Sequence, residues 1–170
     1  MATRILSTMA AAGTAHTNST AETTVGYVAL PPGTFGLGKI INAKGILRAT
    51  ATDSTDTLTV VAYMYTTAVV VSGTALGTSG AVDAANDNTV SFDLTFSPYT
   101  AQGSTAGTIV VHGTMTAVGA EGTVTARAVY QLLSSIDFTA TQYIGIGADW
   151  SVAAAANSCR MEAFDVIEIT

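Results

Sequence analysis

Strict alternation between apolar and polar side chains runs through residues 88–96, NTVSFDLTF. Val90, Phe92, Leu94 and Phe96 occupy every second position, with threonine, serine and aspartate between them. Successive side chains of a β-strand point to opposite faces, so this spacing predicts a strand with one face on a core. The pattern therefore favours a fold built on sheets that are covered on one side.

Three further segments alternate in the same way: TIVVHGTMTA (108–117), TVTARAVYQL (123–132) and YIGIGADW (143–150). Each is predicted to be a strand with one apolar face. For the second segment we expect the core face to consist of the five even-numbered residues, Val124, Ala126, Ala128, Tyr130 and Leu132.

Other strands have a less regular pattern. Residues 57–65, TLTVVAYMY, are apolar on both faces, which is typical of a central or doubly covered strand. Residues 39–52, KIINAKGILRATAT, predict a long strand with a bulge at Gly45. The short segment GYVAL, residues 26–30, precedes a PPG turn.

Turn sequences separate these runs. GAEG at residues 119–122 predicts a tight hairpin, and TDSTDT at residues 52–57 predicts another turn. Threonine, valine, alanine and glycine are abundant and lysine is scarce, which favours strands over helices. About eight antiparallel strands in one domain predict an all-β, two-sheet sandwich of the jelly-roll type.

Two segments do not fit this core. Residues 1–24 form an expected extended N-terminal arm before a sandwich domain at residues 25–170, and residues 66–88 form an expected long loop. Residues 9–24 and 66–88 are made of small and polar residues that bury too little surface to order themselves, so we expect a neighbouring subunit to hold them. The candidate interface residues are Met9, His16, Thr20, Val70, Leu76, Val82 and His112.

Charge and composition argue against several classes of function. The formal net charge is −6 and lysine occurs only at Lys39 and Lys44, so no basic stripe for nucleic acid is present. The sequence contains no run of about 18 apolar residues, so no membrane span is predicted. The N-terminal segment MATRILSTMAAAGTAH is too short and interrupted for a signal peptide, so we expect synthesis in the cytoplasm without export. The single cysteine, Cys159, excludes an internal disulfide.

The sequence shows no catalytic pattern. His16 lies in the arm, and His112 falls on the polar face of its predicted strand, with no serine marked as its partner and no GxSxG motif. Cys159 has no base beside it in the sequence and is expected to be a buried, inert thiol. We therefore expect no enzymatic activity and no cofactor.

Two binding alternatives stay open. The pairs Asp53/Asp56 and Asp83/Asp87 are most simply turn-capping residues, although Asp83 and Asp87 could contribute to a loop calcium site. Tyrosines more often pack half-buried on strands than form sugar-stacking platforms. The chain has six of them, Tyr27, Tyr63, Tyr65, Tyr99, Tyr130 and Tyr143.

The C-terminal segment, WSVAAAANSCRMEAFDVIEIT, is open to two interpretations. Met161, Phe164 and Ile167 recur every three residues, which alone would suit a helix. The β-branched and aromatic content of FDVIEI, and the lack of an N-cap box, favour a strand with one bulge near Ala163 and Phe164.

Three stretches resemble structural proteins of tailed-bacteriophage virions. They are the C-terminal WSVAAAANSCRMEAFDVIEI, the hairpin GTMTAVGAEGTVTARAVY and the long strand GKIINAKGILRATATDSTDTLTVVAYM. The resemblance covers most of residues 36–170 and is a pattern of strands and turns, so it transfers no functional residue.

This resemblance implies a jelly-roll-like subunit of a phage particle. The expected role is a capsid decoration, or cement, protein on the virion surface, with the major capsid protein and further copies of itself as partners, a homotrimer being favoured. A head-fibre or tail module that binds a receptor or carbohydrate is the alternative. Neither nucleic acid nor a membrane is an expected partner.

Overall fold

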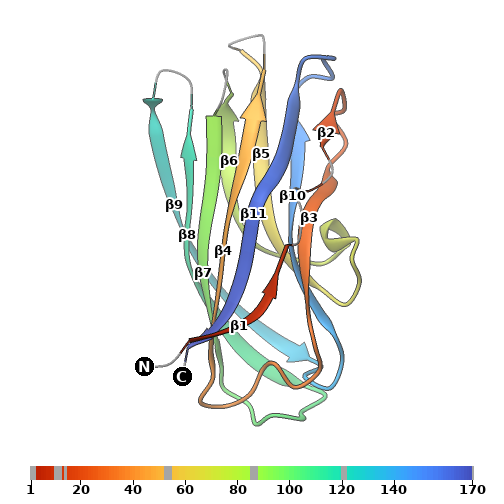
Figure 1. Cartoon of the computed structure of the whole chain (residues 1–170), viewed down its shortest axis with the longest axis vertical. Coiled ribbons are helices and arrows are strands. Elements are labelled where there is room, and N and C mark those ends of the chain that lie inside the picture. The colour runs from red at the N-terminus through yellow and green to blue at the C-terminus, as the bar shows by residue number, and fades with distance from the viewer. Residues whose placement is uncertain are drawn as a thin grey trace.

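The alternating segments form the two sheets of an antiparallel β-sandwich in the computed structural model of this chain (Figure 1). The structure describes residues 3–9, 13, 15–51, 55–84, 88–119 and 122–169. Sheet A has the strand order β1 (Thr3–Thr8), β11 (Ser158–Ile169), β4 (Ile40–Thr50), β7 (Asn88–Pro98), β8 (Gly107–Val118) and β9 (Val124–Ile136), and β2 (His16–Thr17) also pairs with β11. Sheet B has the order β3 (Thr23–Leu30), β10 (Gln142–Trp150), β5 (Thr57–Tyr65) and β6 (Thr74–Asp83).

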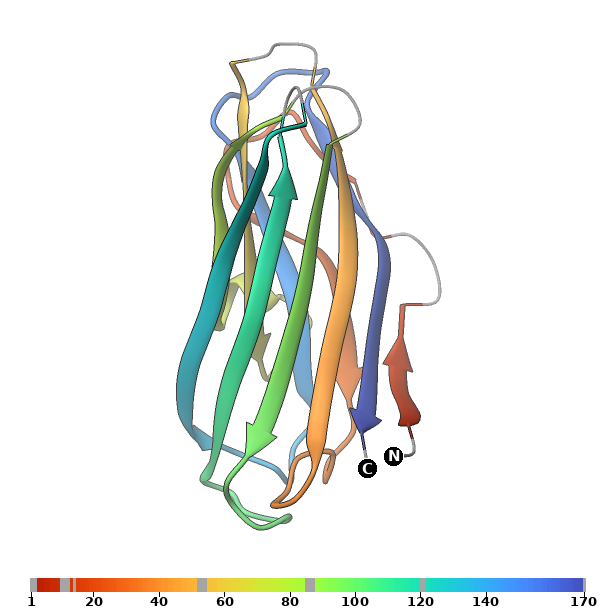
Figure 2. The same ribbon diagram turned by 90° about the vertical axis from the view of Figure 1, so that its left-hand side faces the viewer.

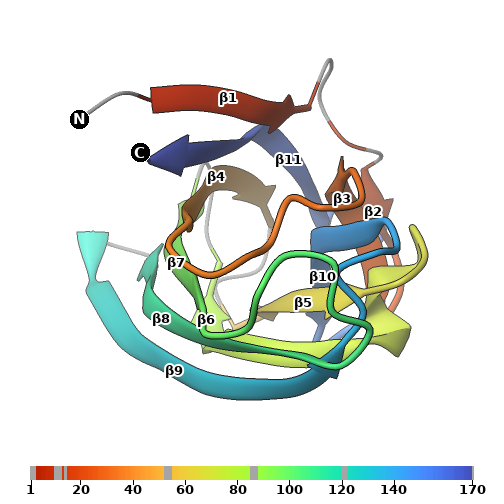
Figure 3. The same ribbon diagram turned by 90° about the horizontal axis from the view of Figure 1, so that it is seen from below.

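The connections wrap the chain around one core. β11 lies between β1 and β4, and β10 lies between β3 and β5, so the two C-terminal strands insert between earlier ones. Viewed from below, the two layers curve around a common interior (Figure 3). The chain contains a short 3₁₀ turn, η1 (Val70–Ser72), and no helix among the described residues is long and apolar enough to span a membrane. The predicted all-β, jelly-roll-like sandwich is confirmed.

The core faces of most alternating strands are the predicted ones. Phe92 on β7 meets Phe164 on β11 edge to face, with ring centroids 5.0 Å apart. On sheet B, Ile144, Ile146 and Trp150 of β10 are fully buried. Burial of these large side chains supplies the main driving force for closing the two sheets on each other.

The C-terminal segment is a strand with one bulge, as predicted. The pairing of β11 with β4 shifts register between Met161 and Ala163, so Met161 and Phe164 both face the core at a spacing of three. The bulge predicted at Gly45 is wrong, because β4 keeps its register with β7 through that residue. A glycine is required at position 45 because a Cβ there would lie 2.5 Å from the Phe92 ring.

Residues 66–88 do not form the expected long loop, because they contain η1 and β6. β6 pairs with β5 but slips register twice, and its buried residues Leu76, Ser79 and Val82 are therefore three apart. These slips remove the period of two by which a strand is found in a sequence.

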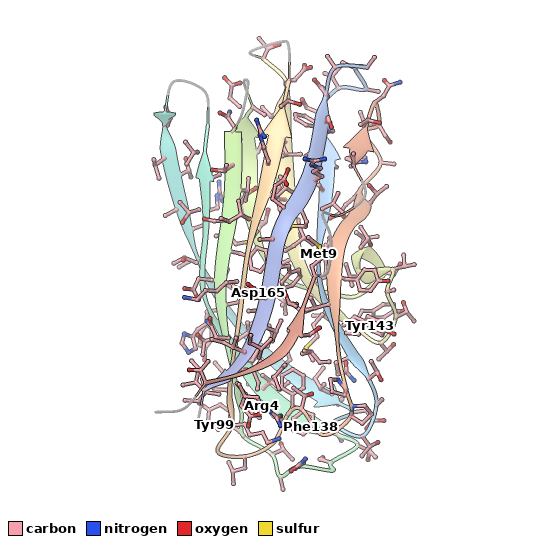
Figure 4. The ribbon with its side chains drawn as sticks, viewed as in Figure 1. Arg4, Met9, Tyr99, Phe138, Tyr143 and Asp165 are labelled. Carbon is pink, nitrogen blue, oxygen red and sulfur yellow. The ribbon has the colours of Figure 1, made fainter. Side chains whose placement is uncertain are left out.

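The N-terminal arm is held by its own chain instead of requiring a neighbour. β1 runs antiparallel to β11, from Thr3 opposite Ile169 to Thr8 opposite Asp165, and the Thr8 hydroxyl donates a hydrogen bond to the Asp165 carboxylate. Arg4 forms an ion pair with Glu168, 2.8 Å between Nη2 and Oε2. Figure 4 shows Arg4 and Asp165 along this side of the sandwich. Residues 3–8 thus extend sheet A by one strand.

Candidate interaction surface

The buried polar group around Cys159 is not a nucleophilic centre. His16 on β2 lies opposite Cys159 on β11, and its Nδ1 is 2.7 Å from the Thr23 hydroxyl. Burial, reinforced by the negative charge of Asp149, raises the pKa of the Cys159 thiol to about 12, so the thiol stays protonated at neutral pH. Burial also lowers the pKa of His16, against the opposing effect of Asp149. This cluster packs β2 onto the sandwich.

The carboxylates of the predicted turns do not form a metal centre in the part of the chain that the structure describes. Asp56 is buried and accepts a hydrogen bond of 2.8 Å from the Asn157 amide, which ties two loops together. Asp53 and Asp87 lie outside the described residues, so the calcium alternative is not tested. Within the described ranges, no three His, Cys, Asp or Glu side chains come together as metal ligands.

Three of the predicted interface residues are core residues of this chain. Val70, Leu76 and Val82 are buried, so they offer no surface to a partner, and their assignment to an interface is wrong. Val70 is buried between η1 and the outer face of sheet B, where η1 lies over Gly145 and Gly147 of β10. A Cβ on Gly145 would lie 2.7 Å from Val70, so a glycine is needed where this turn is seated.

The remaining predicted residues divide between the two sides of the molecule. Met9 is half-buried beside β11, where its backbone N–H donates to the Phe164 carbonyl, and Figure 4 places it between β11 and β3. Thr20 is exposed and precedes β3, and His16 is buried. His112 is exposed on β8, directly opposite Tyr130 of β9. Of the seven predicted residues, only Thr20 and His112 are therefore exposed.

His112 borders a row of exposed apolar side chains on β9. The exposed fractions are 63% for Val124, 71% for Tyr130 and 61% for Leu132. Ala126 and Ala128 lie between them on the same outer face and are also exposed. We call this row the β9 stripe: Val124, Ala126, Ala128, Tyr130 and Leu132.

The β9 stripe is the face that the sequence predicts to be in the core, and this prediction is wrong. The core takes the opposite face of β9, through Val129 and Leu133. Val129 packs onto Gly77 of β6, where a Cβ would lie 2.4 Å from its Cγ2. Both faces of the segment carry apolar residues, so alternation alone could not decide between them. The adjacent Leu132 and Leu133, one on each face, are the signal that was available.

A second surface lies on the opposite side of the sandwich, between β1 and β3. A cavity of about 730 Å³ there is lined by residues that include Met9, Glu22, Tyr27 and Val71. Tyr27 is 44% exposed and meets Tyr143 edge to face, with ring centroids 5.7 Å apart. The six tyrosines do not form one platform, because Tyr130 is on sheet A and Tyr27 and Tyr143 are on sheet B.

Within this second surface, Glu22 is already engaged by the protein. The Tyr63 hydroxyl donates to the Glu22 carboxylate, at 2.8 and 2.9 Å from its two oxygens. Burial and this hydrogen bond raise the pKa of Tyr63, so it remains a neutral donor. The carboxylate is thus partly satisfied before any ligand arrives.

The sequence matches no protein-family model and no curated protein sequence. Among solved structures, the chain is similar to peanut lectin with a 9-mer peptide, at 12% identity over 90% of this chain and 84% of the lectin, with a TM-score of 0.38. It is similar to a structure of infectious bursal disease virus at 15% identity, over 98% of this chain and 32% of the viral one, with a TM-score of 0.34. A legume lectin-like domain from Entamoeba histolytica is 9% identical over 87% of this chain and 82% of that domain, with a TM-score of 0.29. These TM-scores are below 0.5, so the similarities carry no information on function.

Proposed function

We propose that this protein is a structural subunit of a tailed-phage virion that decorates the capsid. It binds the outside of the head, contacts the major capsid protein and stabilises the particle through subunit contacts. The observation that carries this proposal is the β9 stripe, an uncharged apolar row on the outer face of a rigid sandwich. Apolar residues in a contiguous exposed row are typical of protein interaction sites.

The chemistry around the stripe suits a protein contact. Cross-strand neighbours on β8 are Val110 opposite Leu132, His112 opposite Tyr130 and Thr114 opposite Ala128. Apart from His112 and the neutral phenol of Tyr130, none of these side chains is ionisable, so a partner can cover the surface with little charge desolvation. Repetition of a modest contact over a symmetric capsid then gives strong overall binding through avidity.

Capsid binding tests this proposal. We expect the double variant Tyr130→Ser/Leu132→Ser to bind empty capsids of the same virus at least about tenfold more weakly, because exposed aromatic and aliphatic anchors dominate such contacts. The matched control is Tyr27→Ser, an exposed tyrosine on the other sheet, which should bind like the native chain. Co-sedimentation with capsids measures both. Undiminished binding by the folded double variant would contradict the proposal.

A carbohydrate-binding module is the second candidate. It is favoured by one observation, the Tyr27–Tyr143 pair beside the cavity between β1 and β3. Aromatic faces next to polar groups can stack on sugar rings. Binding on a glycan array that Tyr27→Ser abolishes and Tyr130→Ser/Leu132→Ser leaves intact would support this candidate. An array without bound glycans would argue against it.

A further inference from the structure

β9 ends sheet A on the side opposite β1 (Figure 2). Its 13 residues pair with β8, from Val124 opposite Val118 to Ile136 opposite Gly107, and with no other strand in the described part of the chain. Along the free side, alternate backbone N–H and C=O groups point away from the sheet. A free edge of this kind can bind another strand through main-chain hydrogen bonds.

Between Val124 and Leu133, β9 has few of the devices that usually block such an edge. Natural edge strands are kept short, or carry a proline, a bulge or an inward charge. β9 has no proline, and its register with β8 is unbroken from Val124 to Leu133; a bulge follows between Leu133 and Ile136, where Ser135 has a φ of 61°. Its one charged residue, Arg127, is an inward charge, and it lies against Gly80 of β6 within this chain. The outer face is the uncharged β9 stripe.

We propose that the partner of this edge is a second copy of the same chain, with the two β9 strands paired antiparallel about a two-fold axis. An antiparallel edge is complementary to itself, because the same strand reversed offers donors opposite acceptors. The side chains of the stripe are also compatible with this antiparallel arrangement. Tyr130 and Leu132, at the bulky end of the stripe, then lie opposite the smaller Ala126 and Ala128 of the other copy. No like charges meet on the stripe, although the chain as a whole carries −6.

The size of this contact sets its strength. In this register about 11 residues of each β9 are paired, a length of about 37 Å, and the side chains span about 10 Å across the two faces, so two copies bury roughly 700 Å² in total. Stable dimers bury about 1,200 Å² or more. The expected dimer is therefore weak and depends on protein concentration, and it becomes effective where a capsid holds copies close together.

Engineered cysteines on the stripe test the pairing directly. A two-fold axis perpendicular to the sheet passes either through a stripe residue, which then faces itself, or between two neighbours, which then face each other. Single cysteines at positions 126, 128, 130 and 132, alone and in mixtures of two, cover both cases. A disulfide requires Cα atoms within about 7 Å, so only one register cross-links efficiently under mild oxidation. The native Cys159 is buried and does not interfere.

The expected result is a disulfide-linked dimer at one stripe position or one mixed pair, detected by mass under non-reducing conditions. The control, Ile5→Cys on the other edge of sheet A, should stay monomeric. In light scattering, Ala128→Lys should raise the dissociation constant of the native dimer at least tenfold, whereas Ile5→Lys should leave it unchanged. Both substitutions are at exposed positions, so the fold is retained.

Three results would overturn this inference: a chain that is monomeric at every concentration, a dimer without stripe cross-links, or a trimer. The inference uses the same surface as the proposed function, but its test contains no capsids. Capsid binding without self-pairing would reject the dimer alone, and self-pairing without capsid binding would reject the decoration role alone.

Discussion

The two edge strands of sheet A, β1 and β9, differ in length, in charge and in how the core holds them. β1 has 6 residues, shifts register against β11 between Ile5 and Ser7, and carries Arg4 in an ion pair with Glu168. β9 has 13 residues, keeps its register over most of its length and presents an uncharged outer face. Figure 2 shows the two strands at opposite ends of the sheet. One edge is protected against further pairing, and the other is open to it.

The anchoring of the two strands is also opposite. β9 is fixed to the interior by Val129 and Leu133, both buried, although its outer face is bare. β1 adds only the partly buried Leu6 to the core and is otherwise held by backbone pairing and surface contacts. Burial of apolar area is worth far more than an exposed ion pair, so β9 should be the more firmly held strand.

Shortening the side chains of Leu133 on β9 and Leu6 on β1 tests whether β9 is the more firmly held strand. Leu133→Ala should lower the free energy of unfolding by about 3 kcal/mol, because it leaves a cavity in the core. Leu6→Ala, at a partly buried site, should lower it by less than about 1.5 kcal/mol. Urea denaturation of the two variants measures both values. Equal losses would show that β1 is integrated as deeply as β9.

Acid should lower the free energy of unfolding through His16 on β2, by less than the Leu133→Ala substitution does. Burial holds the pKa of His16 below its usual value of about 6.5, so the unfolded chain binds a proton more readily than the folded one. This contribution is intact above about pH 6.5 and is lost as the pH falls below that value. Denaturation at pH 7.5 and 5.5 should show the loss in the native chain and a smaller one in His16→Gln. An identical pH dependence in both proteins would refute this origin.

The sequence predicts well the strands that are buried on one face and regular. The core rows of β7 and β10, and the bulged strand β11, follow from alternation and from residue types, because a covered face leaves a clear period. It fails where tertiary contacts replace that period. β6 slips register twice, and Val70 is buried against Gly145, which lies far from it in the sequence.

The sequence does not predict the exposed β9 stripe, for a related reason. Sequence patterns report which face of a strand is apolar, but they do not report whether a second layer covers it. β9 overhangs sheet B, so only Val129 and Leu133 are covered there, and the more apolar face is left in solvent. The sequence predicts His112 on the polar face of its strand, and the structure places it opposite Tyr130 of that apolar row.

Amide hydrogen exchange at increasing protein concentration tests the central claim most directly, because it reports on both edges of sheet A in one sample. If β9 is an open edge that pairs with a second copy, exchange in residues 124–136 slows as the concentration rises, while exchange in residues 3–8 stays constant. Exchange in residues 124–136 that is independent of concentration, or slowing of equal size in residues 3–8, would contradict the account.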